Sequence, residues 1–405
     1  MGRWRGDRYR TLLLIVIAGL LTLWLRAAQL TILRGSALRS KARSQQAELI
    51  KIPSLRGPIL DRAGEPLALS VEGSSLAVDP ARLTDPEALA LALERRGLLR
   101  APEVRQILDR APVGRRFVWL IRRTILEADA IQLEKEFAPA LIRLSEPKRL
   151  YPLGSAAAPL LGTTGVDGEG LLGLEARYDE HLAGEEGRML DFRSGYSRRH
   201  EGPGRVILES PRIGATAEVT IDARFQQIVD ARLREAVEEQ GARGGTAILL
   251  DPRTGEILAF ASQPAFDPAE VGDADTLSWR VWGVSENYEP GSTYKLVAFA
   301  AAIEASELRP DDLYDCNKGE RRVPGGVISD HDPYGTLRAW EVLAHSSNIG
   351  TGKVAERAGD QEFYRMERLL GFGVPTGVEI PGEERGRIPD PSTWSSRSLI
   401  TQAFG

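Results

Sequence analysis

The chain has 405 residues, 42% of them hydrophobic and 27% charged, a composition typical of a globular protein with two or three domains. Its formal net charge of -5 gives no general attraction to nucleic acid, which argues against a DNA- or RNA-binding protein. The single cysteine, Cys316, excludes an intrachain disulfide and is expected to be a partly buried thiol.

The N-terminus combines a basic tail with a long apolar segment. Residues 1–10 contain four arginines and one acidic residue, and residues 11–33 are mostly apolar, with Arg26 near their end. About 20 such residues span a bilayer, and Arg26 can extend toward the outer headgroups. The basic flank predicts a cytoplasmic N-terminus. A cleaved signal peptide is the alternative, but no clean cleavage site follows, so we favour an uncleaved membrane anchor.

The next two segments carry no catalytic pattern. Residues 34–52 are polar and basic, with helical composition, and are interpreted as a juxtamembrane helix or linker near anionic headgroups. Residues 53–213 mix strand-like and helical stretches with glycine-rich turns, and helices are expected over Pro86–Leu99 and Glu127–Ala138. Within this α+β region, we interpret Asp61 and Arg62 as a structural ion pair.

A second domain is expected over residues 214–405. It opens with a predicted strand, Ala217–Ile221, followed by a helix over Ala223–Gln240 that Asp222 caps. The apolar side of this helix is expected to consist of Phe225, Ile228, Val229 and Leu233. Two strands, Thr246–Leu250 and Glu256–Ala261, are predicted to form a hairpin around a Pro- and Gly-containing turn.

The stretch around Ser292 carries the clearest chemistry. Pro290 and Gly291 end the preceding element, and the Ala-rich run that follows favours a helix in which Ser292 and Lys295 share one face. A lysine amine can take the proton of a serine hydroxyl if burial or nearby cations lower its pKa. The positive end of the helix would lie beside the attacked carbonyl. This pattern is typical of a serine acyl-transferase.

A second motif, Ser346-Ser347-Asn348, follows a stretch interpreted as amphipathic. The apolar residues of that stretch are Leu337, Trp340, Leu343 and Ala344. A hydroxyl and an amide two positions apart can reach both a lysine ammonium and a leaving amine. Two chance matches are set aside: Pro147 interrupts Ser145–Lys148, and Ser285–Asn287 lies too close to the Pro290-Gly291 break.

Together, Glu289–Lys295 and Ser346–Gly350 resemble the first two active-site motifs of the class B penicillin-binding proteins. Three more blocks resemble this family's pedestal and first catalytic hairpin, in the family's order: Arg56–Ala68, Val166–Glu175 and Leu250–Ala259. The resemblance implies a multidomain α+β protein with a single N-terminal transmembrane helix. A dimerisation or pedestal domain would cover residues 53–213. A transpeptidase domain, with an antiparallel sheet packed between helices, would cover residues 214–405.

The activity implied is that of a peptidoglycan D,D-transpeptidase that forms a serine acyl-enzyme and is a target of penicillins. Ser292 would be the nucleophile and Lys295 the general base, while Ser346 would relay a proton to the leaving amine. Asn348 would hydrogen-bond Lys295 and the substrate amide, and Ser347 is also assigned to substrate binding. The family implies no cofactor or metal, and Asp330–Asp332 alone is too small a ligand set.

The implied partners are peptidoglycan stem peptides, β-lactams, an FtsW-like glycosyltransferase and other divisome proteins, with no nucleic acid. The implied location is the bacterial cytoplasmic membrane, with one span, the N-terminus inside and the catalytic domain outside. Glu289-Pro290-Gly291 together with Ser-Ser-Asn-Ile-Gly is closer to the division-specific, FtsI-like branch than to the elongation-specific branch.

One family motif is not found. The third motif, Lys/His-Thr/Ser-Gly, does not occur after Asn348, and Arg253-Thr254-Gly255 precedes the nucleophile and is interpreted as a turn. We therefore expect the chain to stop before an oxyanion-hole donor and the last strands, and to be inactive or poorly folded as it stands. The alternatives are a catalytically silent divisome scaffold and a penicillin sensor or β-lactamase. The penicillin sensor or β-lactamase is disfavoured because proteins of these two kinds lack pedestal motifs such as Arg56–Ala68.

Overall fold

The computed structural model describes residues 3–34, 47–112, 114–115, 117–125, 127–165, 167–192, 205–268, 275–306 and 308–405. The chain divides into two compact units. The first consists of Met1–Ile59, Ala68–Leu150 and Glu180–Ala217. The second consists of Leu60–Leu67, Tyr151–Asp179 and Glu218–Gly405.

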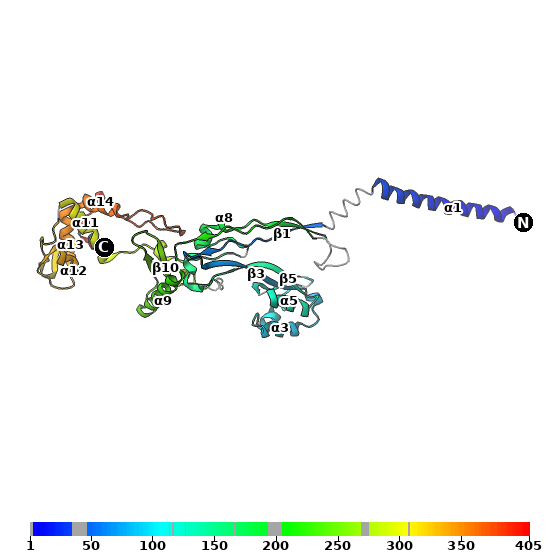
Figure 1. Ribbon diagram of the computed structural model, residues 1–405, viewed down its shortest axis with the longest axis horizontal. Helices are drawn as coiled ribbons and strands as arrows, with labels where there is room; N and C mark the ends of the chain where they lie inside the picture. The colour runs from blue at the N-terminus through cyan, green and yellow to red at the C-terminus, as the bar shows by residue number, and fades with distance from the viewer. Residues whose placement is uncertain are drawn as a thin grey trace. The chain divides into compact units, whose positions relative to one another are not determined.

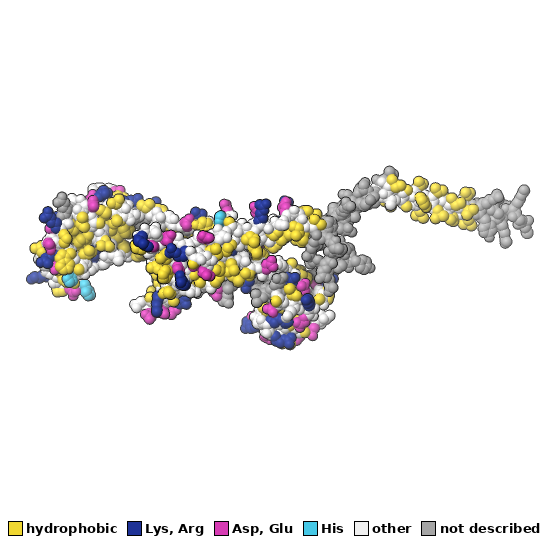
Figure 2. Space-filling view, viewed as in Figure 1, with side chains coloured by type: hydrophobic (Ala, Val, Ile, Leu, Met, Phe, Trp, Pro, Cys, Tyr) yellow, Lys and Arg dark blue, Asp and Glu magenta, His cyan; other side chains and the backbone are white. Residues whose placement is uncertain are grey.

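The apolar N-terminal segment forms helix α1 (Arg3–Ala28), which continues as a π-helical turn over Gln29–Leu33. Within the described residues, Leu12–Ile32 is the one stretch of helix long and apolar enough to cross a membrane. Figure 2 shows hydrophobic side chains along α1. Their exposure is what a lipid-facing helix requires, since it has no protein core to pack against.

Part of the predicted linker is a strand. Strand β1 (Ala47–Ile52) pairs antiparallel with β6 (Gly187–Phe192), which in turn pairs with β7 (Arg205–Glu209). The prediction of a helix or linker is therefore wrong for residues 47–52, and residues 35–46 lie outside the described residues. Pairing with β6 satisfies the backbone of β1, so tertiary contacts override its helical composition.

The other sheet of the first unit carries its helices. Strand β3 (Pro66–Val78) pairs with both β4 (Val118–Ile125) and β5 (Leu141–Leu150). The helices that pack in the same hydrophobic core are α3 (Pro86–Arg95), α4 (Ala101–Asp109) and α5 (Glu127–Glu136). Two of them confirm predicted helices. Ser145 and Lys148 both lie in β5, which explains why this S-x-x-K match forms no helical site.

The remaining short elements are given by their bounds. The short strands are β2 (Ile59–Leu60) and β8 (Ala217–Glu218), and the short helices are α6 (Ala158–Leu161), α7 (Gly173–Arg177) and α8 (Asp179–Leu182). Strand β8 is the beginning of the strand predicted over Ala217–Ile221, most of which is not in a sheet.

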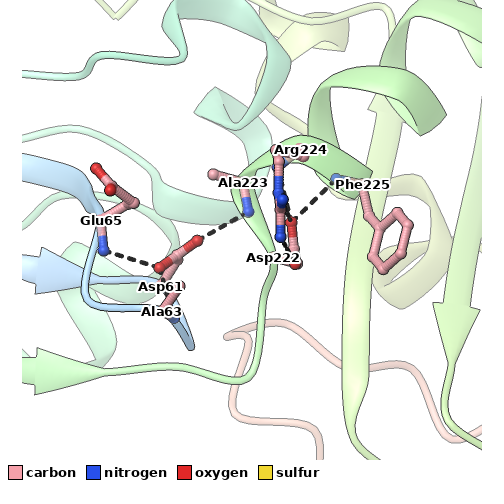
Figure 3. A network of polar contacts seen from close by, with 7 residues as sticks. All are labelled: Asp61, Ala63, Glu65, Asp222, Ala223, Arg224 and Phe225. Carbon is pink, nitrogen blue, oxygen red and sulfur yellow. Dashed lines mark hydrogen bonds and ion pairs between the residues drawn. The ribbon is translucent and has the colours of Figure 1, made fainter.

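Asp61 and Arg62 do not form an ion pair with each other. The Asp61 carboxylate accepts backbone N–H bonds from Ala63 at 2.8 Å, Glu65 at 2.9 Å and Ala223 at 3.1 Å (Figure 3). Arg62 instead pairs with Glu256 at 3.3 Å. Burial tends to raise the pKa of Asp61, but the backbone donors together hold it below its ordinary value. Asp61 thus ties its own turn to the start of the next helix.

That helix, α9 (Ala223–Gln240), begins at its predicted cap, because the Asp222 carboxylate accepts the N–H groups of Arg224 and Phe225. The hairpin β9 (Gly245–Leu250) and β10 (Ile257–Gln263) is also confirmed. The predicted apolar side of α9 is only partly buried, with Val229 and Leu233 half-buried. Phe225 is 43% exposed and Ile228 59% exposed.

Polar residues occupy the buried side of α9 instead. The Gln226 amide exchanges hydrogen bonds with the backbone N–H and C=O of Phe260 at 2.8 and 2.9 Å. The Asp230 carboxylate accepts a hydrogen bond from Gln263 at 2.7 Å. Helix α9 is therefore fastened to β10 by hydrogen bonds, and no hydrophobic periodicity can predict that arrangement.

A helical cluster follows, in which α11 packs against α13 and α14 (Figure 1). Its helices are α10 (Trp282–Ser285), the 3-10 turn η6 (Gly291–Tyr294), α11 (Lys295–Ser306), α12 (Ala339–Ala344), α13 (Asn348–Ala358), α14 (Asp360–Leu369) and α15 (Ser398–Gln402). Its strands form two pairs, β11 (Leu313–Asp315) with β14 (Thr336–Arg338) and β12 (Glu320–Val323) with β13 (Gly326–Ser329). Ala298 and Ala301 of α11 are buried with Val297, Phe363 and Met366 in its core.

The buried face of α12 also differs from the prediction. Ala339 and Val342 are buried, whereas Trp340 is 50% exposed. Because α12 has only six residues, its apolar positions do not fix one face. Packing against β11 and α13 decides which side is buried.

Candidate active site

Ser292 lies at the start of the helix predicted for it. Gly291 has φ +64°, a left-handed conformation that glycine adopts without a steric penalty, and the turn η6 then leads directly into α11. Ser292 is exposed, while Lys295, the first residue of α11, is only 1% exposed. The local sequence thus presents a hydroxyl to solvent and buries the amine that follows one turn later.

Ser346 is held in an unusual backbone conformation. Helix α12 ends in a Schellman motif, in which the N–H groups of Ser346 and Ser347 donate to the carbonyls of Leu343 at 3.1 Å and Val342 at 3.0 Å. Ser346 therefore occupies the left-handed position that glycine usually fills, with φ +56°. Such a conformation costs on the order of 1 kcal/mol for a residue with a side chain.

These residues form one hydrogen-bonded chain. The Lys295 ammonium donates to Ser346 Oγ at 2.8 Å and also to the Ser346 backbone carbonyl. Ser346 Oγ donates to Ser292 Oγ at 3.2 Å. In the part of the chain that the structure describes, Ser292 and Lys295 share no direct hydrogen bond, so Ser346 stands between them.

The charge of Lys295 is set by two opposing effects. Burial lowers the pKa of its ammonium below the ordinary value, because a buried cation loses its hydration. The negative charge of Asp330 raises the pKa again in part. Burial is the larger effect, and it favours the neutral amine that a general base requires.

Ser347 and Asn348 have other contacts. Ser347 is fully buried, and its hydroxyl donates to the Asp330 carboxylate at 2.6 Å and accepts the N–H of Gly350 at 2.9 Å. It is thus placed to hold the turn rather than to touch a substrate. The Asn348 amide donates to the backbone carbonyl of Ser329 at 3.0 Å, whereas the Lys295 ammonium donates to Ser346 and not to Asn348 among the described contacts. The contact of Asn348 with a substrate amide stays a prediction.

Sequence reasoning missed a buried pair behind the nucleophile. The Tyr294 hydroxyl donates to Glu367 at 2.7 Å, and the Tyr294 ring packs against Phe372 with 4.8 Å between ring centroids. Burial raises the pKa of Glu367 to about 7, although the bond from Tyr294 acts to lower it. The available signal was spacing, because Glu367 lies four residues after the core residue Phe363 on the same helix face.

The competing motifs and the thiol form no second site. Ser285 Oγ donates to the carbonyl of Val281, and Thr254 lies in the turn between β9 and β10. Cys316 is buried, and burial raises the pKa of its thiol. A protonated, buried thiol is a poor nucleophile.

Comparison with known proteins places these residues in a family. The family model of the penicillin-binding protein dimerisation domain matches residues 51–198, and that of the penicillin-binding protein transpeptidase domain matches residues 245–405. This chain belongs to the class B penicillin-binding proteins. Ser292, Lys295, Ser346 and Asn348 of this penicillin-binding protein all lie within the transpeptidase match.

Individual proteins similar to this chain belong to the same family. Penicillin-binding protein PbpB of Mycolicibacterium smegmatis is 31% identical over 98% of this chain and 65% of its own length. The peptidoglycan D,D-transpeptidase FtsI of Escherichia coli is 28% identical over 99% of this chain and 68% of its own. A solved structure of penicillin-binding protein 3 from Mycobacterium tuberculosis, complexed with ampicillin, has a TM-score of 0.60 and 27% identity, covering 88% of this chain and 60% of that one. This chain thus spans about two thirds of the length of these relatives.

Proposed function

We propose that this protein is a serine-type peptidoglycan D,D-transpeptidase that cross-links stem peptides in cell-wall synthesis, and that penicillins acylate it. The observation that carries the proposal is the chain Ser292–Ser346–Lys295, which joins an exposed hydroxyl to a buried amine. The transpeptidase family model that covers these residues supports the same reaction.

Acylation begins at Ser292. Its Oγ bonds to the carbonyl carbon of the D-Ala-D-Ala peptide bond, and its proton passes through Ser346 Oγ to the neutral amine of Lys295. The chain of 3.2 and 2.8 Å hydrogen bonds supports this route. The peptide C–N bond then breaks, Lys295 returns the proton through Ser346 to the leaving amine, and D-Ala departs. Ser292 is left as an acyl ester.

The second half reverses these proton movements. An amine of a neighbouring stem peptide attacks the ester, and Lys295 takes the proton that the amine loses. The bond between Ser292 Oγ and the acyl carbon breaks, the hydroxyl regains its proton, and the new amide is the cross-link. A β-lactam enters at the first step, because its strained amide presents a similar carbonyl to Ser292.

Charge developing on the carbonyl oxygen also needs stabilisation. The backbone N–H of Ser292 is one donor, at the N-terminal end of the turn that leads into the 12-residue helix α11, whose dipole favours negative charge there. Loss of one such donor typically costs about 3 kcal/mol.

For location and partners we propose the division-specific arrangement. The apolar helix Leu12–Ile32 would cross the cytoplasmic membrane with the N-terminus inside. The remainder would face the cell wall and work with an FtsW-like glycosyltransferase and other divisome proteins. The FtsI relative and the residues Glu289–Gly291 support this branch. The elongation-specific role is the alternative.

The test uses the protein isolated from its own membranes and a stem peptide ending in D-Ala-D-Ala, with an amine acceptor. We expect release of D-Ala and formation of the cross-linked dimer. Ser292→Ala is expected to abolish both, whereas Ser145→Ala, in the S-x-x-K match on strand β5, is expected to change neither. Cross-linking that survives Ser292→Ala would contradict the proposal.

A further inference from the structure

Asp330 lies directly after strand β13, at the turn that carries Ser346. One carboxylate oxygen accepts the Ser347 hydroxyl at 2.6 Å, and the other accepts the backbone N–H of Ile349 at 2.9 Å. The Asp330 N–H donates to the carbonyl of Gly319 at 3.0 Å, which anchors the residue itself. A single side chain therefore clamps the first turn of α13 to the hairpin β12–β13.

The clamp adds side-chain hydrogen bonds to a turn whose backbone is already held by its Schellman motif. Ser346 has the left-handed φ of +56°, and its Oγ must stay within reach of both Ser292 and Lys295. The residue after it, Ser347, is fixed by Asp330 on one side and by the N–H of Gly350 on the other. Releasing Ser347 would allow the turn to relax toward an unstrained conformation.

Asp330 also acts on Lys295 through its charge. The charged residues of α13, which packs against α11, are engaged elsewhere: Glu356 with Arg321, Arg357 with Asp312, and Lys353 with Asn317. On α14, Glu367 bonds to Tyr294, and on α12, Glu341 bonds to the backbone of Arg338. The negative charge of the Asp330 carboxylate acts to raise the pKa of the Lys295 ammonium, against the larger lowering effect of burial.

We propose that Asp330 is a positioning residue of this site, which holds the Ser346–Asn348 turn against Ser292 and places a negative charge next to the residue that Lys295 bonds. This inference rests on the proposed function. A negative charge beside Lys295 stabilises its ammonium, so Asp330 keeps the amine protonated to a higher pH than burial alone would. The same carboxylate thus has two effects on the proton relay: it positions Ser346, and its charge shifts the pH at which Lys295 can accept a proton.

The test measures the rate constant for acylation of Ser292 by a labelled penicillin between pH 5 and pH 9, with the protein isolated from its own membranes. Asp330→Asn keeps the size and an acceptor oxygen but removes the charge. The acylation rate of this variant is expected to rise from its acid limit at a lower pH than the rate of the wild type. Asp332→Asn, which removes a charge two residues away, is the matched control and is expected to leave the profile unchanged.

Ser347→Ala separates the two roles. It removes the hydroxyl that links Asp330 to the turn but leaves the charge, so the acylation rate is expected to fall about tenfold at every pH while the acid limb stays in place. Asp330→Ser is a second neutral variant whose shorter hydroxyl also loses the clamp, so we expect the same movement of the acid limb together with a loss of rate. Thermal unfolding of each variant checks that it is folded.

Three outcomes are distinguishable. The inference is supported if the acid limb of the rate profile moves to lower pH in the neutral Asp330 variants. The limb must also stay at its wild-type pH in Ser347→Ala and Asp332→Asn. A uniform loss of rate with an unmoved limb in folded Asp330→Asn and Asp330→Ser would overturn it, since that is a purely structural effect. A wild-type protein that penicillin does not acylate at Ser292 would instead contradict the proposed function.

Discussion

Two regions of the molecule hold their helices in place by different interactions. They are the helical cluster around Ser292 and the segment formed by α9 and its hairpin. In the cluster, α11, α13 and α14 bury Val297, Ala301 and Phe363 against one another. In the other segment, polar side chains fasten α9 to β10, while Phe225 and Ile248 remain partly exposed, at 43% and 44%.

The difference shows where the site obtains its geometry. All three residues of the proton relay sit at helix ends inside the cluster, and each is positioned by contacts made within it. Among the described residues, the exposed apolar side of α9 makes none of the hydrogen bonds that hold the relay. The site should therefore respond strongly to changes in the cluster and weakly to changes on α9.

The largest expected effect comes from truncating a core aromatic residue in each region. Phe363→Ala removes a fully buried ring that lies 6.4 Å from Tyr294 and 6.3 Å from Trp394, and should lower the free energy of unfolding by about 4 kcal/mol. Phe225→Ala, at a half-exposed position, should cost about 1 kcal/mol. Denaturant titration of both variants measures this contrast. Equal losses in the free energy of unfolding would contradict the difference between the two regions.

The next effect depends on pH. Burial raises the pKa of Glu367 from 4.5 to about 7, so the folded protein binds this proton more tightly than the unfolded chain and loses stability as pH rises through that range. Ionised Glu367 then costs about 3 kcal/mol. Glu367→Gln should be more stable than the wild type by about that amount at pH 8, and by less than about 1 kcal/mol at pH 5.

Glu362→Gln, on the same helix, is the control with the opposite sign. Its hydrogen bond from Arg365 lowers the pKa of Glu362, so the carboxylate stabilises the fold above its ordinary pKa and loses that contribution in acid. This variant should be slightly less stable than the wild type at pH 8. A Glu367→Gln variant whose stability relative to the wild type does not change with pH would show that Glu367 is not held in a desolvated site.

The smallest effect concerns the strained turn. Ser346→Gly and Ser346→Ala both remove the hydroxyl that links Lys295 to Ser292, so both should lose acylation. Only glycine relieves the left-handed φ of +56°, so Ser346→Gly should be more stable than Ser346→Ala by about 1 kcal/mol. Thermal unfolding compares the two, and equal stabilities would mean that the turn stores no strain.

Local sequence was sufficient where a structure is specified locally. Pro290-Gly291 before an Ala-rich run correctly predicted a turn leading into a helix, and Asp222 correctly predicted the cap of α9. The hairpin around Asp251–Gly255 followed from its turn residues in the same way.

Predictions from local sequence failed where a segment's structure depends on residues that are distant in the chain. Strand β1 depends on β6, more than a hundred residues away, and the buried face of α12 depends on β11 and α13. Asn348 bonds to Ser329 because β13 ends beside it, and Asp330, directly after β13, accepts the N–H of Ile349. These contacts follow from tertiary packing, which no spacing within one segment encodes.

The most direct test of the central claim is the intact mass of the protein isolated from its own membranes, before and after incubation with penicillin, followed by peptide mapping. We predict a gain of one penicillin, located on Ser292, that is lost in Ser292→Ala and retained in Ser145→Ala. No mass gain in the wild type, or a gain located on another residue, would contradict the assignment of Ser292 as the nucleophile.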